Sequence, residues 1–81
     1  MTSASPTVFQ LKPVNPQVYS VHTQAGEHVG NLKLIGGDWK FKAIGYEANG
    51  SIVPGGGPLT GRHNLRFASA DAALVSAGLS S

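Results

Sequence analysis

The stretch NLKLIGGDWKFKAIGY, residues 31–46, alternates apolar and polar residues on both sides of two glycines. Consecutive glycines favour a two-residue hairpin turn, because the tightest hairpin turns need positive φ at one or both central residues. A two-residue loop pairs Ile35 with Asp38, and this pair fixes the ladder on both strands. The next predicted pairs are Leu34–Trp39, Lys33–Lys40 and Leu32–Phe41.

This register separates the side chains of the hairpin into an apolar and a polar face, because neighbouring residues of a strand point in opposite directions. The predicted core face holds Leu32, Leu34, Trp39 and Phe41. Each of these side chains stabilises the fold by roughly 1.5–3 kcal/mol when fully buried. The opposite face receives Asn31, Lys33, Lys40 and Lys42.

Further strands are predicted on both sides of this hairpin. The segment VYSVHT (18–23) is rich in β-branched and aromatic residues, and the turn QAGE connects it to a strand over 28–35. The strand over 38–48 ends at an Asn-Gly dipeptide, which is typical of a type I′ turn. A short strand over 51–53 follows.

A helix is predicted over 70–77, near the C-terminal end of the sequence. Ser69 is the expected N-cap, Asp71 suits the first turn of the helix dipole, and Gly78 is the expected stop. The expected inward face consists of Ala70, Ala73, Leu74 and Ala77.

The fold class is therefore α+β: a three- to four-stranded antiparallel sheet with one C-terminal helix packed on one face. The length of 81 residues fits one domain, which we place at 18–81. Residues 1–17 contain three prolines and are predicted to form a flexible tail, in which the segment TVFQL is a candidate short edge strand.

Composition excludes several classes of function. The chain has no cysteine, so it forms no disulfide and has no thiolate for metal binding or catalysis. The four acidic residues fall in separate predicted elements, and we expect no enzyme activity, no cofactor and no metal site. No apolar run has the length of a membrane span or a signal peptide, and a cytoplasmic protein without membrane contact is expected.

The lysines of the central hairpin indicate a binding surface. Like charges opposite each other in a ladder are mildly destabilising, so the grouping suggests an anionic partner. Tyr19 and Tyr46 are candidate stacking partners on the same face. The hypothesis is nucleic-acid binding through Lys33, Lys40, Lys42, Tyr46, Arg62, His63 and Arg66. The alternative is a solvated sheet face on which lysines oppose edge-to-edge pairing.

A second hypothesis concerns apolar residues of the same face. If His22 pairs with His28 in a regular ladder, an apolar strip falls on the lysine side. It would consist of Val21, Val29, Ile44 and Val53. Such an exposed strip would make the protein a homodimeric or protein-interaction module.

The glycine-rich loop 54–61 leads into Arg62 and His63, and GGPLTGRH comes close to the spacing of a phosphate-binding P-loop. Arg62 stands where that motif needs lysine, and His63 stands where it needs serine or threonine. A P-loop also joins a strand of a parallel sheet to a helix, and a chain of 81 residues is too short to form that sheet. Two interpretations of the loop stay open, an anion-binding loop and a connector.

The order GDWKFKAIGY followed by FASADAA resembles three-stranded-sheet DNA-binding domains, such as the arm-binding domains of phage-type integrases and the plant ethylene-response-factor domain. The matching positions are Trp39, Lys40, Ala43, Phe67, Ala72 and Ala73. The resemblance implies DNA binding by the sheet, with Trp39 on the binding face, whereas the predicted register buries Trp39. As a whole, the chain resembles small bacterial or prophage-type proteins of unknown function with a β-β-β-α layout.

Overall fold

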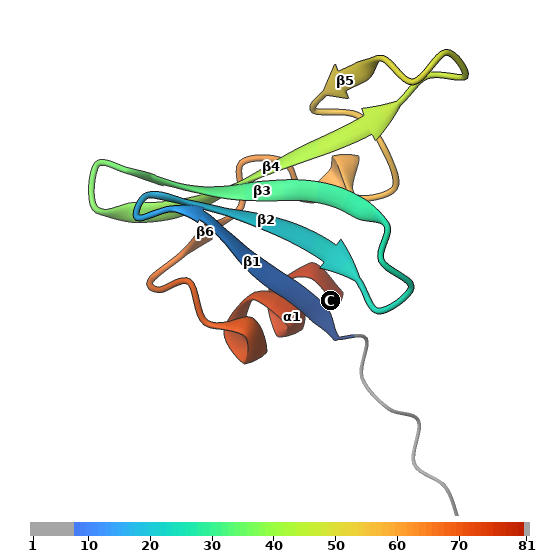
Figure 1. Cartoon of the computed structure of the whole chain (residues 1–81). Helices are drawn as coiled ribbons and strands as arrows, with labels where there is room; N and C mark the ends of the chain where they lie inside the picture. The colour runs from blue at the N-terminus through green and yellow to red at the C-terminus, as the bar shows by residue number, and fades with distance from the viewer. Residues whose placement is uncertain (1–7, 81) are drawn as a thin grey trace, which may run out of the picture.

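The structure, a computed structural model, describes residues 8–80. The described strands are all paired antiparallel and form one sheet, with the order β1-β2-β3-β4-β5 and with β6 also paired to β4 (Figure 1). The elements are β1 (Phe9–Asn15), β2 (Val18–Thr23), β3 (His28–Ile35), β4 (Asp38–Tyr46), β5 (Ile52–Pro54), the 3-10 helix η1 (Thr60–Arg62), β6 (Arg66–Phe67) and α1 (Ala72–Ser80).

The central hairpin of β3 and β4 has the predicted register. Ile35 pairs with Asp38, and the pairs continue through Leu34–Trp39, Lys33–Lys40 and Leu32–Phe41. The two turn glycines have φ values of 60° and 87°, a region that side chains rarely allow. The glycine turn and the alternation of apolar and polar residues therefore specify the same register, which explains why the hairpin of β3 and β4 is predictable.

The sheet has more strands than the three to four predicted. The additional strands are the edge strand β1, which overlaps the candidate edge strand TVFQL of the predicted tail and extends beyond it to Asn15, and the two-residue β6. Phe9 in β1 is 4% exposed, and Leu11 lies opposite Val21 of β2. Phe9 and Leu11 thus point toward the core, while Pro13 is tolerated because β1 is an edge strand. Residues 1–7 lie outside the described part of the chain.

An irregularity between β2 and β3 changes which side chains reach the core. His22 pairs with His28 as predicted, but Val21 pairs with Gly30, so Val29 is an extra residue on β3. A bulge of this kind shifts the following side chains to the other face of the strand pair. Val21 and Val29 are consequently buried, at 0% and 1% exposure.

The helix α1 begins and ends later than predicted. The Oδ2 atom of Asp71 accepts the Leu74 N–H at 2.9 Å, so Asp71 is the N-cap and the prediction of Ser69 is wrong. Gly78 lies inside the helix, not at its end. A Cβ at Gly78 would lie 2.5 Å from Cε1 of Phe67, so glycine lets the helix approach this ring.

The inward face of α1 also differs from the prediction. Val75, Ser76 and Leu79 are buried, whereas Leu74 is 42% exposed. The side chains of Val75 and Leu79 belong to the core cluster above the sheet, and the rotation of the helix follows from this packing. The predicted face of Ala70, Ala73, Leu74 and Ala77 is wrong, although Ala70, which precedes the helix, packs against the core.

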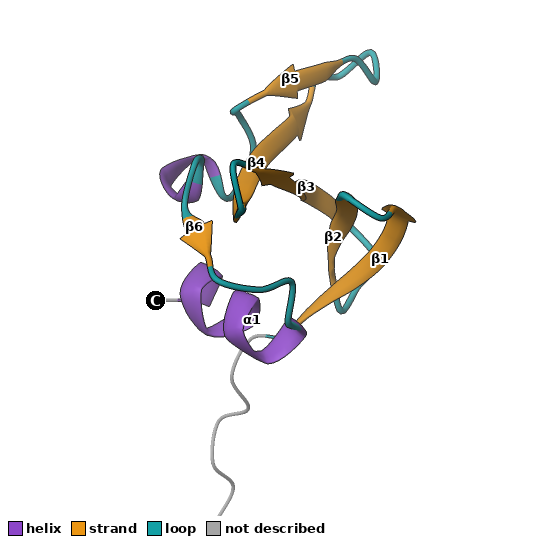
Figure 2. Cartoon of the chain, turned by 90° about the vertical axis from the view of Figure 1, so that its left-hand side faces the viewer, coloured by secondary structure: helices purple, strands orange, loops and turns teal. Residues whose placement is uncertain are grey.

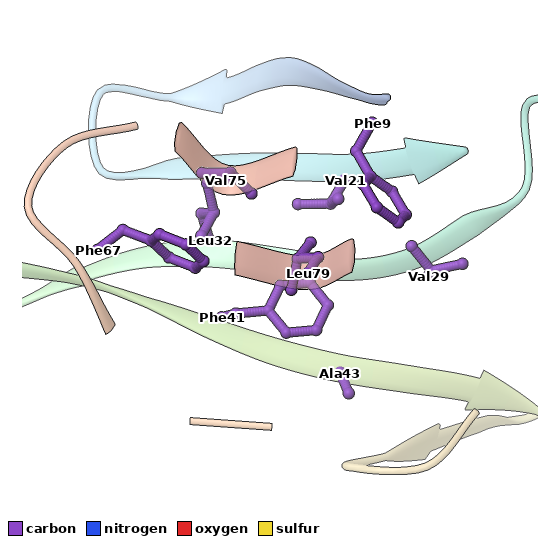
Figure 3. Close-up of a cluster of buried hydrophobic side chains, with 9 residues drawn as sticks. All are labelled: Phe9, Val21, Val29, Leu32, Phe41, Ala43, Phe67, Val75 and Leu79. Atoms are coloured by element: carbon purple, nitrogen blue, oxygen red, sulfur yellow. The ribbon is translucent and has the colours of Figure 1, made fainter. Parts of the chain in front are cut away.

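The sheet curls around α1, which fills the opening between β6 and β1 (Figure 2). Side chains from the sheet and the helix form one hydrophobic cluster (Figure 3). Its members are Phe9, Val21, Val29, Leu32, Phe41, Ala43, Phe67, Val75 and Leu79. The Phe9 N–H donates to Oγ of Ser76 at 2.9 Å, which ties the first described strand to the helix.

Candidate nucleic-acid interface

Two neighbouring rows of side chains run across the strands on the face opposite α1. The ladder pairs define the first row as Lys12, Ser20, Asn31 and Lys42. The second row is Val18, Lys33, Lys40 and Arg66. Five of the six lysine and arginine residues of the sequence therefore share one face of the sheet. We call this surface the basic face, defined by Lys12, Lys33, Lys40, Lys42 and Arg66.

The second row places three cations side by side. Lys33, Lys40 and Arg66 occupy directly opposite positions on β3, β4 and β6, where Cβ atoms of neighbours lie about 4.5–5.5 Å apart. Asp38 accompanies them, with its Oδ2 atom 3.8 Å from Nη1 of Arg66. Both partners are largely exposed, so this ion pair stabilises the fold by less than about 1 kcal/mol. The face retains a clear excess of positive charge.

Lys12 is the member of the basic face that sequence reasoning missed. It lies on β1, within the segment assigned to the tail, so no face was predicted for it. The signal was present in the alternation of Phe9 and Leu11 with Gln10 and Lys12, which is the pattern of a half-buried strand.

A stacked pair of histidines lies at one end of the basic face. The rings of His22 and His28 have centroids 4.8 Å apart and an interplanar angle of 19°. Nε2 of His22 is hydrogen-bonded to Oγ of Ser20 at 2.9 Å, and Nε2 of His28 to Oδ1 of Asn31 at 3.1 Å. Nδ1 of His28 is hydrogen-bonded to the hydroxyl of Tyr46 at 3.2 Å. These bonds hold the imidazoles in fixed positions beside the first row.

The surroundings of His22 disfavour its charged form. Burial lowers its pKa below the usual value, and the neighbouring charges of His28 and Lys12 lower the pKa further. A backbone hydrogen bond involving Gly26 acts in the opposite direction. The neutral form of His22 therefore predominates at pH 7.

The remaining predicted site residues have different positions. Tyr46 is at the end of β4 and is 51% exposed. Tyr19 points to the core side, where its ring packs edge to face against Trp39 with 5.4 Å between the ring centroids. His63 is a structural acceptor, because its Nδ1 takes the Ala43 N–H at 3.1 Å. Arg62 lies in η1 and has no place in either row.

Lys42 has a partner from the loop before β6. Its Nζ donates to Oδ1 of Asn64, a residue with a φ of 71°. The Asn64 N–H in turn donates to the Phe41 carbonyl at 2.7 Å. The loop thus holds the ammonium group of Lys42 at the rim of the basic face.

The glycine-rich loop packs as a connector on the edge of β4. The Gly55 N–H donates to the Ala43 carbonyl at 2.7 Å, and the Gly56 N–H to the Val53 carbonyl at 3.1 Å. These two donors are therefore not directed at an external anion. A Cβ at Gly45 would lie 2.6 Å from the Gly57 nitrogen, so two backbones touch here and glycine is needed.

The apolar strip expected on the lysine side does not form. Val21 and Val29 belong to the core because of the bulge, and Ile44 is 7% exposed. Val53 alone of the four is on the surface, at 36% exposure. The apolar strip on which the hypothesis of a homodimeric or protein-interaction module was based is therefore not formed by these four residues.

Residues 8–80 contain no group of three or more histidine and acidic side chains that could hold a metal ion. Within the same residues, no helix has the length and apolar character needed to cross a membrane. Comparison of the chain with protein-family models, curated proteins and solved structures gives no match. The function is therefore inferred from the geometry of the site.

Proposed function

We propose that the protein is a non-enzymatic, cytoplasmic module that binds nucleic acid through the basic face. The observation that carries the proposal is the gathering of five of the six basic residues on one face of the sheet. A chain that needed these charges only for solubility would have no reason to place three of them in one row. The phosphates of a nucleic acid offset the mutual repulsion of that row.

The arrangement suits a polyanion better than a single anion. The five cations are spread over β1, β3, β4 and β6, so they can contact several phosphates at once. The second row ends at Arg66, whose side chain is exposed, so a long polyanion can extend past the end of the row. Binding of this kind is dominated by the release of counterions and is steeply dependent on salt.

The salt dependence gives the test. Five phosphate contacts with a DNA duplex predict a slope of about −4.5 in log K against log salt concentration. Between 50 and 200 mM salt this slope weakens binding about 500-fold. Fluorescence anisotropy of a labelled duplex measures the slope directly.

Two arginines provide a matched pair of variants. Arg66→Gln removes one charge from the basic face, and Arg62→Gln removes the same charge away from it. We expect Arg66→Gln to reduce the slope by about 0.9 and Arg62→Gln to leave it unchanged. Circular dichroism checks that both variants fold. Equal effects of the two variants, or binding that is insensitive to salt, would refute the proposal.

A further inference from the structure

We infer that the ligand is a DNA duplex, contacted through the phosphates of both strands and bound without sequence preference. This inference rests on the proposed function and specifies its substrate. Three features of the basic face carry it: the spacing of the cations, the width of the sheet and the positions of the aromatic rings.

Within the first row, the cations stand at the two ends and the middle is uncharged. Lys12 on β1 and Lys42 on β4 stand at the ends of the first row, with Ser20 and Asn31 between them. Three strand spacings separate the ends, which is about 14 Å along the sheet. The major groove of B-form DNA is about 12 Å wide. Lysine side chains at this separation can reach the phosphates on both borders of one groove.

The sheet is too broad to enter the groove that it spans. Four strand spacings lie between β1 and β6, or about 19 Å along the curled sheet, whereas a major groove admits one helix or a two-stranded ribbon. In the middle of the face, Oδ1 of Asn31 is already hydrogen-bonded to His28. The base edges are therefore not read, and contacts to phosphates carry no information about sequence.

The aromatic rings are in the wrong places for a single strand. Proteins that bind single strands place exposed rings among their basic residues, so that bases stack on them. Here Tyr19 and Trp39 lie on the core side and contact each other. His22 and His28 stack on one another, and Tyr46 stands at the end of β4. The two cationic rows themselves contain no aromatic side chain.

The experiment compares three probes by anisotropy at 50 mM salt. They are a 16-base-pair duplex, a second duplex of the same composition in shuffled order, and a 32-nucleotide single strand with a similar number of phosphates. We expect the two duplexes to bind within twofold of each other, and the single strand to bind at least tenfold more weakly.

Two variants distinguish the modes of binding. Lys12→Gln removes the cation on the far side of the groove and is expected to reduce the duplex salt slope by about 0.9. Tyr46→Leu removes the exposed ring and is expected to leave duplex affinity unchanged.

The outcomes separate the two proposals. Tighter binding of the single strand, weakened by Tyr46→Leu, overturns the duplex inference while the proposed function stands. A large difference between the two duplexes likewise overturns it. Absence of binding to all three probes refutes the proposed function and the inference together.

Discussion

Gly30 should be intolerant of even one methyl group, although its backbone conformation is ordinary. It lies on β3 opposite Val21 of β2 and Ala43 of β4. A Cβ at this position would lie 2.5 Å from Cε1 of Phe41 and 2.7 Å from the carbonyl oxygen of Lys42. The ring is fully buried and the carbonyl belongs to the ladder, so neither can move without disturbing other contacts.

The expected cost of Gly30→Ala follows from overpacking. Inserting a methyl group into a close-packed core destabilises a protein by about 1–3 kcal/mol. A domain of this size has a total free energy of unfolding of about 4–12 kcal/mol, so the loss is a large fraction of it. Each kcal/mol corresponds to a decrease of about 4–8 °C in Tm.

The assay is thermal and urea unfolding followed by circular dichroism, with Gly61→Ala as the matched control. A Cβ at Gly61 would meet nothing within 4 Å, and its φ is not in the left-handed region. We expect this control to change the free energy of unfolding by no more than about 1 kcal/mol, with stabilisation the expected sign.

A double-mutant cycle tests the contact itself. Phe41→Leu removes the ring atoms that the new methyl group would meet, so Gly30→Ala should cost less in that background. The expected coupling energy exceeds about 0.5 kcal/mol. If Gly30→Ala and Gly61→Ala have the same Tm, the close approach of Gly30 and Phe41 is refuted.

Three further predictions concern the helix and the histidine pair. Ser76→Ala leaves the buried N–H of Phe9 without its acceptor and should cost about 1–3 kcal/mol in urea unfolding. Asp71→Ala removes the N-cap and should cost about 0.5–2 kcal/mol, whereas Ser69→Ala should cost far less; the reverse order would contradict the cap assignment. Burial lowers the pKa of His22, so the unfolded chain takes up a proton near pH 6.5 before the folded one does. The free energy of unfolding should therefore decrease as the pH falls from 6.5 to the folded pKa, and His22→Gln should flatten this dependence in urea titrations between pH 5 and 7.5.

The parts of the fold that were predictable depend on neighbours in the sequence. The glycine turn and the alternation around it determine the register of β3 and β4, and with it the opposition of Lys33 and Lys40. The bulge at Val29 was not predictable, because one extra residue in a strand leaves no trace in composition. Its effect is large, since it moves Val21 and Val29 from the lysine side into the core.

The predictions that failed concern features that depend on contacts between residues distant in the sequence. The pairing of Arg66 with Lys40 needs β6, whose two residues carry no strand pattern of their own. The rotation of α1 depends on the volume left above Phe41 and Phe67, which the helix sequence does not reveal. Three of the five residues of the basic face, Lys33, Lys40 and Lys42, could thus be derived from one hairpin, and the positions of the other two required the folded chain.

The hydrogen bond from Phe9 to Ser76 has a consequence for the protein during its synthesis. Its partners are 67 residues apart in sequence. At a ribosomal rate of about 5–20 residues per second, roughly 3–13 s pass between the two residues. Hairpins form within about 1–10 μs, so β1 to β4 can pair long before α1 exists. Until α1 has been synthesised, the core face of the sheet, with Phe9, Val21 and Leu32, therefore lacks its cover, and the nascent chain is prone to aggregation during this interval.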